Sequence, residues 1–309
     1  MNLRLKQRAS RIPGAKPSSF YGYLIPGLVG LVVIIVIPLL VNFYISFTSW
    51  RGVGTPRWTG STNWKRVAHD QAFWASFQHS LLMILAITIV PTILGLFISS
   101  LLTDVIQKKF GSKTASLFRG IYYLPQILPI AVATVIMGWI FRPENGAVNA
   151  LLKAVGLGSL QRNWLGTSSL AMPVLMIILL WIQLGYPIVI FMSGLQRVDP
   201  ELYEAADLDG AGWWQKFKVI TLPEIVPELL VVLLTSTIGA LKTFGPVYML
   251  TKGGPGTSTT VPSYYSYTEY FQIQQVGYGA TISTALTLVI VVFAVLFTTL
   301  QSYAEKRAD

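Results

Sequence analysis

The residues of this sequence best suited to recognising another molecule lie in a polar, glycine-broken segment between two long apolar runs. The pattern is Glu204-Ala205-Ala206, three residues, Gly210, nine residues, and then Ile220-Thr221-Leu222-Pro223. A chain that is otherwise largely apolar has little physical reason to carry such a segment unless a soluble partner contacts it. The chemistry expected of these residues is therefore recognition of a protein surface, and no catalytic residues are predicted.

The first half of this segment carries the signals of a short helix. Asp199-Pro200-Glu201 supplies an N-cap acid, a proline at the first helical position and another acid in the first turn. The helix should include Glu204 and end near Asp209-Gly210, because glycine readily adopts the left-handed backbone that closes a helix. The sequence therefore predicts a helix followed by a turn.

The second half predicts another short helix. Trp213, Phe217 and Ile220 are spaced four and three residues apart, which places them on one helical face. Leu222-Pro223 ends this helix and leads into the next apolar run. On these signals alone, a docking element and a structural elbow that only joins two membrane spans explain the segment equally well.

A second set of polar residues lies within the apolar run 225–247. With Glu228 at 0° on a regular helix, Thr235 falls at about −20°, Gly239 at about +20° and Lys242 at about −40°. Polar groups in a membrane span nearly always face the bundle interior or water, so this stripe predicts the lining of a pathway. Helix packing by small and hydroxyl residues explains Thr235 and Gly239 as well, but it does not explain Lys242.

The elements that must position these residues are membrane-spanning helices. Hydrophobic residues make up 53% of the 309 and charged residues 12%, about half the ~25% charge of a typical soluble domain. Six apolar runs are each long enough to cross a hydrocarbon core of about 30 Å: 22–48, 80–102, 120–141, 170–193, 225–247 and 281–303. We expect an all-α membrane protein with six transmembrane helices.

The distribution of charge predicts how these helices are oriented. Most of the 23 Lys and Arg residues fall in 1–21, 103–119, 194–224 and the tail after 303. Because cytoplasmic segments carry an excess of Lys and Arg, both termini are predicted to be cytoplasmic. The net charge of +10 therefore reflects topology, and no nucleic-acid partner is expected. Residues 1–20 form a basic cytoplasmic arm that could also contact membrane lipid, and 21–309 form the transmembrane domain.

Several kinds of chemistry are absent from the sequence. There is no cysteine, and the two histidines, His69 and His79, do not suggest a ligand pair, so no metal site is predicted. Residues 253–256 read Gly-Gly-Pro-Gly, which is a turn and not a phosphate-binding loop, and no Walker pattern occurs. No cofactor is expected in this chain, and any ATP hydrolysis must belong to another subunit.

The segment described first resembles the EAA loop of bacterial ABC importer permeases, with its spacing intact. Other residues narrow the resemblance to the carbohydrate-uptake permeases of the maltose and glycerol-3-phosphate type, and the resemblance covers essentially the whole chain. These residues are Leu195-Gln196, Pro200-Glu201-Leu202-Tyr203, Asp209-Gly210-Ala211, Trp214, Phe217, Phe244, Tyr248, Leu250-Thr251, Gly253-Gly254-Pro255-Gly256, Arg119 with Leu124-Pro125, and Trp181 with Gly185-Tyr186-Pro187. One departure is Gly245, which replaces an acid found in many relatives.

The resemblance implies the fold of a type I ABC importer permease in the bacterial cytoplasmic membrane. Residues 199–223 would be its cytoplasmic coupling loop, which seats in a cleft of the ATP-binding subunit, with Glu204 pairing with a basic residue there. The coupling residues implied are Glu204, Ala205, Ala206, Asp209, Gly210, Trp213, Phe217, Ile220, Leu222 and Pro223. The substrate path implied comprises Tyr186, Ser236, Gly239, Ala240 and Thr243, and the polar stripe of the run 225–247 adds Thr235 and Lys242 to it.

The same resemblance implies a set of partners. These are a second, homologous permease in a heterodimeric pore, two ATP-binding subunits that hold ATP and Mg, and an extracytoplasmic solute-binding protein that delivers a sugar or oligosaccharide. Glycerol 3-phosphate or a related polar solute is the alternative cargo, which Lys242 leaves open. An ion-coupled secondary transporter is the alternative of another class, and a membrane-embedded enzyme is disfavoured because the spans lack clustered His, Asp or Glu.

Overall fold

The computed structural model describes residues 17–308, with side chains described for 23–106 and 109–302. These residues are mostly helical, as predicted, and an isolated bridge between Thr48 and Trp58 is the β-type pairing among them. The predicted basic arm 1–20 lies outside the described residues except for 17–20, which begin the first helix.

Four helical stretches in the described part of the chain are long and apolar enough to cross a membrane: Tyr23–Ile45, Gln71–Ile106, Ser168–Leu195 and Val276–Ser302. The first comprises α1 (Pro17–Leu31), η1 (Val32–Val36) and α2 (Ile37–Ile45). The second comprises α4 (Gln71–Ile84), η2 (Leu85–Ile89), α5 (Val90–Leu101) and η3 (Leu102–Gln107). The third comprises α10 (Ser168–Gln183) and α11 (Gly185–Leu195). The fourth lies in α17 (Val276–Ala308). They correspond to four of the six predicted spans.

Prolines explain where three of the helical stretches loosen into a wider π-turn. Each such turn ends two residues before a proline, which lacks an N–H and whose ring clashes with the carbonyl four residues earlier. The π-turn absorbs that clash without ending the helical path. The three are η1 before Pro38, η2 before Pro91 and η5 (Phe217–Thr221) before Pro223.

The third predicted span, 120–141, is divided between two helices. Helix α7 (Ser112–Ile127) starts eight residues earlier than predicted, and it meets α8 (Ile130–Ile140) at an angle of 95°. The break occurs at Leu128, which has the extended backbone that a following proline favours, and Pro129 is the N-cap of α8. The pair counts as a fifth span only if the bent helices are taken together.

The fifth predicted span, 225–247, is shorter than predicted. Helix α15 (Val226–Leu241) has 16 residues, or about 24 Å of helix. Lys242 is its C-cap, and the chain continues through η6 (Val247–Thr251) into α16 (Pro262–Tyr267) and η7 (Thr268–Gln272). The short connecting elements are α3 (Thr62–His69), α6 (Lys108–Phe110), α9 (Ala147–Ala154) and η4 (Gly158–Leu160).

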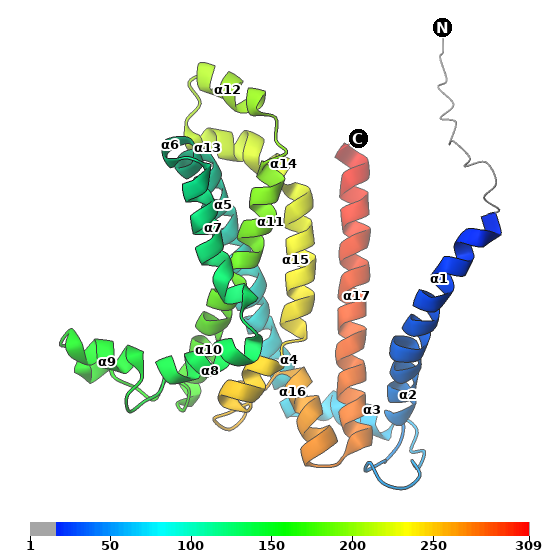
Figure 1. The fold of residues 1–309 in the computed structure, drawn as a ribbon. Helices are drawn as coiled ribbons and strands as arrows, with labels where there is room; N and C mark the ends of the chain where they lie inside the picture. Colours follow the sequence, from blue (N-terminus) through cyan, green and yellow to red (C-terminus); the bar gives the residue numbers. More distant parts are fainter. Residues whose placement is uncertain (1–16, 309) are drawn as a thin grey trace.

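The helices form a central bundle, with α17 and the α1–α2 stretch beside it (Figure 1). Helices α4, α5, α7, α10, α11 and α15 make up the bundle, and buried residues such as Met83, Leu175 and Ala240 fill its core. Helix α17 and the α1–α2 stretch run along one side, where the Asn42 amide donates to Thr284 Oγ1 at 2.9 Å. Short helices α12 (Pro200–Leu208), α13 (Trp213–Lys216) and α14 (Leu222–Glu224) project from one end of the bundle, the end at which α17 finishes.

Candidate functional site

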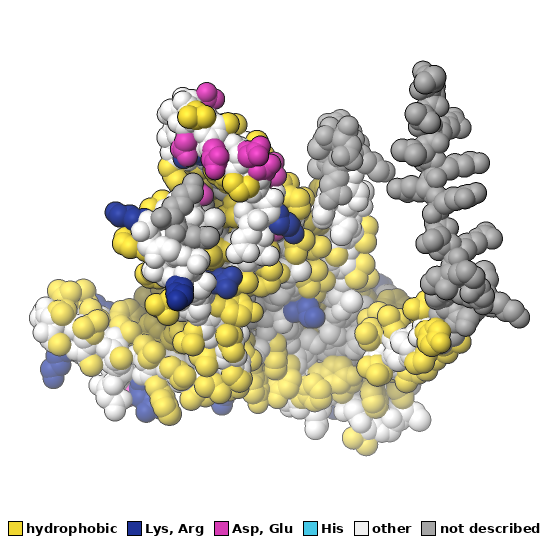
Figure 2. Space-filling model, turned by 45° about the horizontal axis from the view of Figure 1, so that its top comes forward, with side chains coloured by type: hydrophobic (Ala, Val, Ile, Leu, Met, Phe, Trp, Pro, Cys, Tyr) yellow, Lys and Arg dark blue, Asp and Glu magenta, His cyan; other side chains and the backbone are white. Residues whose placement is uncertain are grey.

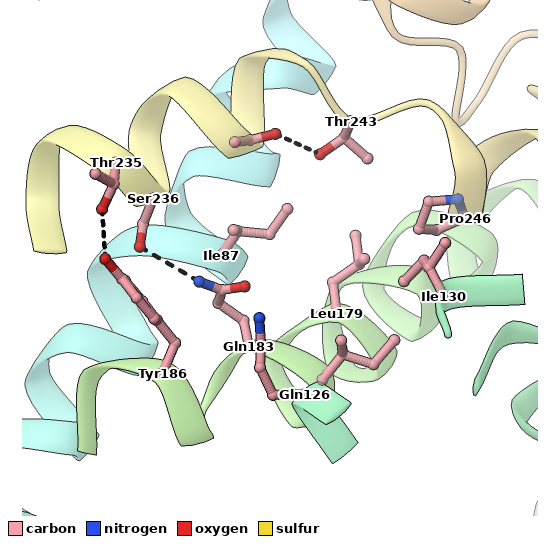
Figure 3. A pocket seen from close by; sticks show the side chains of 12 residues that line it. Ile87, Gln126, Ile130, Leu179, Gln183, Tyr186, Thr235, Ser236, Thr243 and Pro246 are labelled. Carbon is pink, nitrogen blue, oxygen red and sulfur yellow. Dashed lines mark hydrogen bonds between the residues drawn. The ribbon is translucent and has the colours of Figure 1, made fainter. Parts of the chain in front are cut away.

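A cavity of about 430 Å³ lies inside the bundle, between α15 and the helices that face it (Figure 3). Its walls come from η2, α7, α8, α10, α11 and α15 and from the two residues Thr243 and Pro246 that follow α15. The lining residues are Ile87, Gln126, Ile130, Leu179, Ile182, Gln183, Tyr186, Thr235, Ser236, Gly239, Thr243 and Pro246. None of these twelve side chains is charged, so the cavity suits a neutral polar molecule better than an ion.

Hydrogen bonds across the cavity join α15 to the helices opposite (Figure 3). The hydroxyls of Tyr186 and Thr235 lie 2.9 Å apart, and the Gln183 amide donates to Ser236 Oγ at 3.4 Å. The Gln126 side-chain oxygen is buried and has no hydrogen-bond partner among the described residues. A buried acceptor without a partner is costly, and Gln126 is a lining residue, so its amide group is a candidate to bind a hydroxyl in the cavity.

Five residues of the predicted substrate path line this cavity: Tyr186, Thr235, Ser236, Gly239 and Thr243. Gln126 and Gln183 also line it and are not among the predicted residues. An amide side chain inside an apolar run is a signal that could have identified both, because membrane spans hold such groups where they face other helices or water.

Two residues of the predicted path lie elsewhere. Ala240 is fully buried in the bundle core and does not line the cavity. Lys242 is exposed and lines a separate cavity of about 460 Å³ with residues of α16 and α17, such as Ser263 and Thr287. Lys242 is the C-cap of α15, seven residues beyond Thr235, and at that level the helix faces α16 and α17 instead of the helices that line the central cavity.

Glu228, at the other end of the predicted stripe, does not reach the cavity either. It lies in the first turn of α15, where it is buried and pairs with Arg197, which follows α11. The predicted stripe therefore divides between three environments, and only its middle part faces the central cavity.

The segment 199–223 folds at its start as the sequence predicts. Asp199 caps α12 by accepting a hydrogen bond from the Glu201 N–H at 3.0 Å. Asp209 is the C-cap, and Gly210 follows it with φ +75°, in the left-handed region. Glu204 is exposed, and Leu208 is 90% exposed. Figure 2 shows acidic side chains gathered at this end of the molecule, over α12 to α14.

The second half of the segment differs from the regular helix that was predicted, because α13 has four residues and gives way to the π-turn η5. Its aromatic side chains stack on one another and on the bundle, with Phe217 buried and Trp214 exposed. Phe217 is 4% exposed and stacks on Phe97 of α5, with ring centroids 5.3 Å apart, and on Trp213 at the same distance. Trp214 stacks on Phe97 at 5.9 Å. This stack seats the segment on the second span.

At the opposite end of the bundle, Asp70 ties three elements together. Its carboxylate caps α4 by accepting from Ala72 N, and it accepts hydrogen bonds from the hydroxyls of Tyr265 on α16 and Tyr278 on α17. Burial would raise the pKa of Asp70, but these hydrogen bonds and one from Phe73 N outweigh it, so the pKa lies below the usual value of 3.8. The elements that follow the cavity residue Thr243 are thereby fixed to α4.

Comparison with known families decides what kind of protein carries this cavity and this loop. The model of the family described as "Binding-protein-dependent transport system inner membrane component" matches residues 92–309, which include the loop and every cavity-lining residue except Ile87. The chain belongs to this family. It is the permease subunit of an ABC importer, a multi-pass component of the inner membrane, and its role is transport and not catalysis.

Individual relatives agree with this assignment. The permease is 33% identical to a probable ABC transporter permease protein of Pyrococcus horikoshii, over 92% of this chain and 96% of that one. It is 30% identical to the trehalose/maltose transport system permease protein of Thermococcus litoralis, over 89% and 92% of the two chains. In fold it resembles the crystal structure of a bacterial ABC transporter that imports alginate, with a TM-score of 0.81 at 20% identity, over 93% of this chain and 96% of that one.

Proposed function

We propose that this permease conducts a sugar or oligosaccharide through the cavity between α11 and α15. The observation that carries the proposal is the uncharged lining, in which the Tyr186 ring stands beside the side chains of Gln126, Gln183 and Ser236. Sugars offer an apolar ring face for stacking and hydroxyls for hydrogen bonding, and a mostly apolar pocket with a few polar groups serves both. The trehalose/maltose permease among the relatives supports the same class of cargo.

Glycerol 3-phosphate is less well supported as the cargo. An anionic solute would gain most from a cationic side chain at the site. The basic residue of the predicted path, Lys242, lines the neighbouring cavity instead, and no charged residue lines the central one. We therefore favour a neutral sugar.

Six spans with both termini in the cytoplasm remain our proposal for the topology. In this arrangement the bent pair α7–α8 is the third span and α15, with its flanking residues, is the fifth. The end of α17 lies toward the same end of the molecule as α12 (Figure 1), and the basic residues of the loops favour that end as the cytoplasmic one.

Residues 199–223 are proposed to dock in ATP-binding subunits, which supply ATP and Mg. The exposed Leu208 gives the docking face an apolar contact, and Glu204 gives it a charge for a basic group of that subunit. The proposed assembly contains two such subunits, a second homologous permease and an extracytoplasmic solute-binding protein. The family description itself names dependence on a binding protein.

The test is uptake by vesicles that contain the assembled transporter. The radiolabelled sugar bound by the neighbouring solute-binding protein is offered with and without internal ATP. We expect uptake that requires ATP, the ATP-binding subunits and the binding protein, and that weakens when Tyr186 is replaced by leucine. Uptake driven by an ion gradient without these components would instead identify a secondary transporter.

A further inference from the structure

An ion pair closes the neck of the coupling loop, which is the place where residues 199–223 leave the bundle and return to it. Arg197 lies two residues beyond the end of α11, and Glu228 lies in the first turn of α15. The guanidinium of Arg197 contacts Oε1 of Glu228. The whole segment 199–223 leaves and re-enters the bundle between these two residues, so the pair joins the helix before the loop directly to the helix after it.

The surroundings favour this pair in two ways. A positive charge near the C-terminus of α11 and a negative charge at the N-terminus of α15 each complement a helix dipole. The Glu228 side chain is 10% exposed and the Arg197 side chain 69%, so the carboxylate is the buried partner. Removing the guanidinium would leave a buried charge uncompensated, which is far more costly than losing a surface pair.

Gly194 makes room for the carboxylate. A Cβ atom added at Gly194 would lie 2.9 Å from Cδ of Glu228 and 3.1 Å from its Oε2. The last turn of α11 therefore accommodates the Glu228 head group where another residue would carry a side chain. The second oxygen, Oε2, is buried without a hydrogen-bond partner among the described residues. Glu228 and Arg197 both line a cavity of about 270 Å³ beside the pair.

The same two helices are joined again at the central cavity, through Tyr186 on α11 and Thr235 on α15. Tyr186 precedes Arg197 by eleven residues and Thr235 follows Glu228 by seven, or about 16 Å and 10 Å along a helix. A displacement of the loop neck can therefore be transmitted to the cavity along α11 and α15. These two helices are joined at the neck by Arg197 and Glu228 and at the cavity by Tyr186 and Thr235.

We propose that Arg197 and Glu228 are positioning residues for coupling: their ion pair makes the end of α11 and the start of α15 move with the coupling loop as one unit. Without the pair, the end of α11 and the start of α15 can move apart. Movement of the docked loop then separates these helix ends and does not shift the residues at the cavity. The inference rests on the proposed docking of residues 199–223.

The experiment compares the reconstituted transporter carrying Arg197→Gln, Glu228→Gln, Gly194→Ala or the charge exchange Arg197→Glu/Glu228→Arg. Sugar transported per ATP hydrolysed, retention of the ATP-binding subunits and melting temperature are measured for each. Lys153→Gln, on the exposed surface of α9, is the matched control for loss of one charge.

We expect each single variant to retain the ATP-binding subunits but to lower the transport-to-hydrolysis ratio about fivefold or more, the lower end of ordinary coupling between sites. The charge exchange should recover part of that ratio, and Lys153→Gln should keep all of it. Gly194→Ala tests the same link without changing any charge.

An unchanged ratio in Glu228→Gln, or transport and hydrolysis that fall together in every variant, would overturn the inference, because the pair would then be only structural. Failure of the underlying docking proposal gives a different signature: a transporter with Gly210→Trp in the loop would keep its ATP-binding subunits as fully as the wild type.

Discussion

The hydroxyl of Tyr186 on α11 and the hydroxyl of Thr235 on α15 lie 2.9 Å apart at the wall of the central cavity. The Thr235 hydroxyl also donates to the Val231 carbonyl of its own helix at 2.7 Å, so the Tyr186 hydroxyl is the donor in the pair. This bond holds the Tyr186 ring against α15 and fixes the position of its face in the cavity (Figure 3).

The Tyr186 ring should matter more to transport than its hydroxyl. Tyr186→Leu removes the stacking surface and should raise the KM for sugar about tenfold, the factor that corresponds to ~1.4 kcal/mol. Tyr186→Phe keeps the ring and should change KM less than about threefold, because a hydrogen bond of this kind contributes only about 0.5–1.5 kcal/mol net. Uptake kinetics in vesicles measure both, and equal effects of the two variants would contradict the stacking role.

Gln126 should show a trade-off between stability and transport. Gln126→Leu removes a buried oxygen that has no partner among the described residues, which should raise the free energy of unfolding by about 1 kcal/mol. The same change should raise KM, because a hydrogen-bond acceptor for the sugar is lost. Thermal melting and uptake are compared with Ile130→Leu, a change at another lining position that alters shape but not polarity. A less stable variant with normal KM would assign Gln126 to structure instead.

Gly210 should be more important than Glu204 for assembly with the ATP-binding subunits. Gly210 has φ +75°, which costs other residues about 1–2 kcal/mol, and the space around it is open. Gly210→Val should therefore distort the turn and reduce subunit retention in a pull-down, whereas Gly210→Asn should be tolerated. Glu204→Ala should reduce retention less, since an exposed ion pair contributes about 0–1 kcal/mol. Equal or reversed effects would refute this order.

Asp70 should stabilise the protein at neutral pH and lose that contribution in acid. Its pKa is lower in the folded chain than the usual 3.8, so its stabilisation is present above 3.8 and disappears as pH falls through the folded pKa. Asp70→Asn should therefore lower the free energy of unfolding by about 1 kcal/mol at pH 7, and its melting temperature should be below that of the wild type. The difference should shrink toward pH 3. A difference that is constant with pH would mean that the carboxylate charge is not responsible.

Local signals were sufficient for the first half of the segment 199–223. The Asp199 cap and the turn at Gly210 depend on neighbours within a few residues, and both occur as predicted. The regular second helix was not recovered, because Pro223 converts the turn before it into a π-turn. Proline has a different local effect at Leu128-Pro129, where α7 ends and the chain turns by 95° into α8.

The sequence by itself determined that this chain lies in a membrane, which runs are helical, and where the first helix and the turn of residues 199–223 lie, because each depends on composition and on residues close in the chain. A helical wheel, however, reports only the side of its own helix and not what faces that side. Only the tertiary structure separated Thr235 from Lys242, brought Gln126 into the cavity, and joined Arg197 to Glu228. Those relationships arise from packing between helices that are distant in sequence, and no local pattern encodes them.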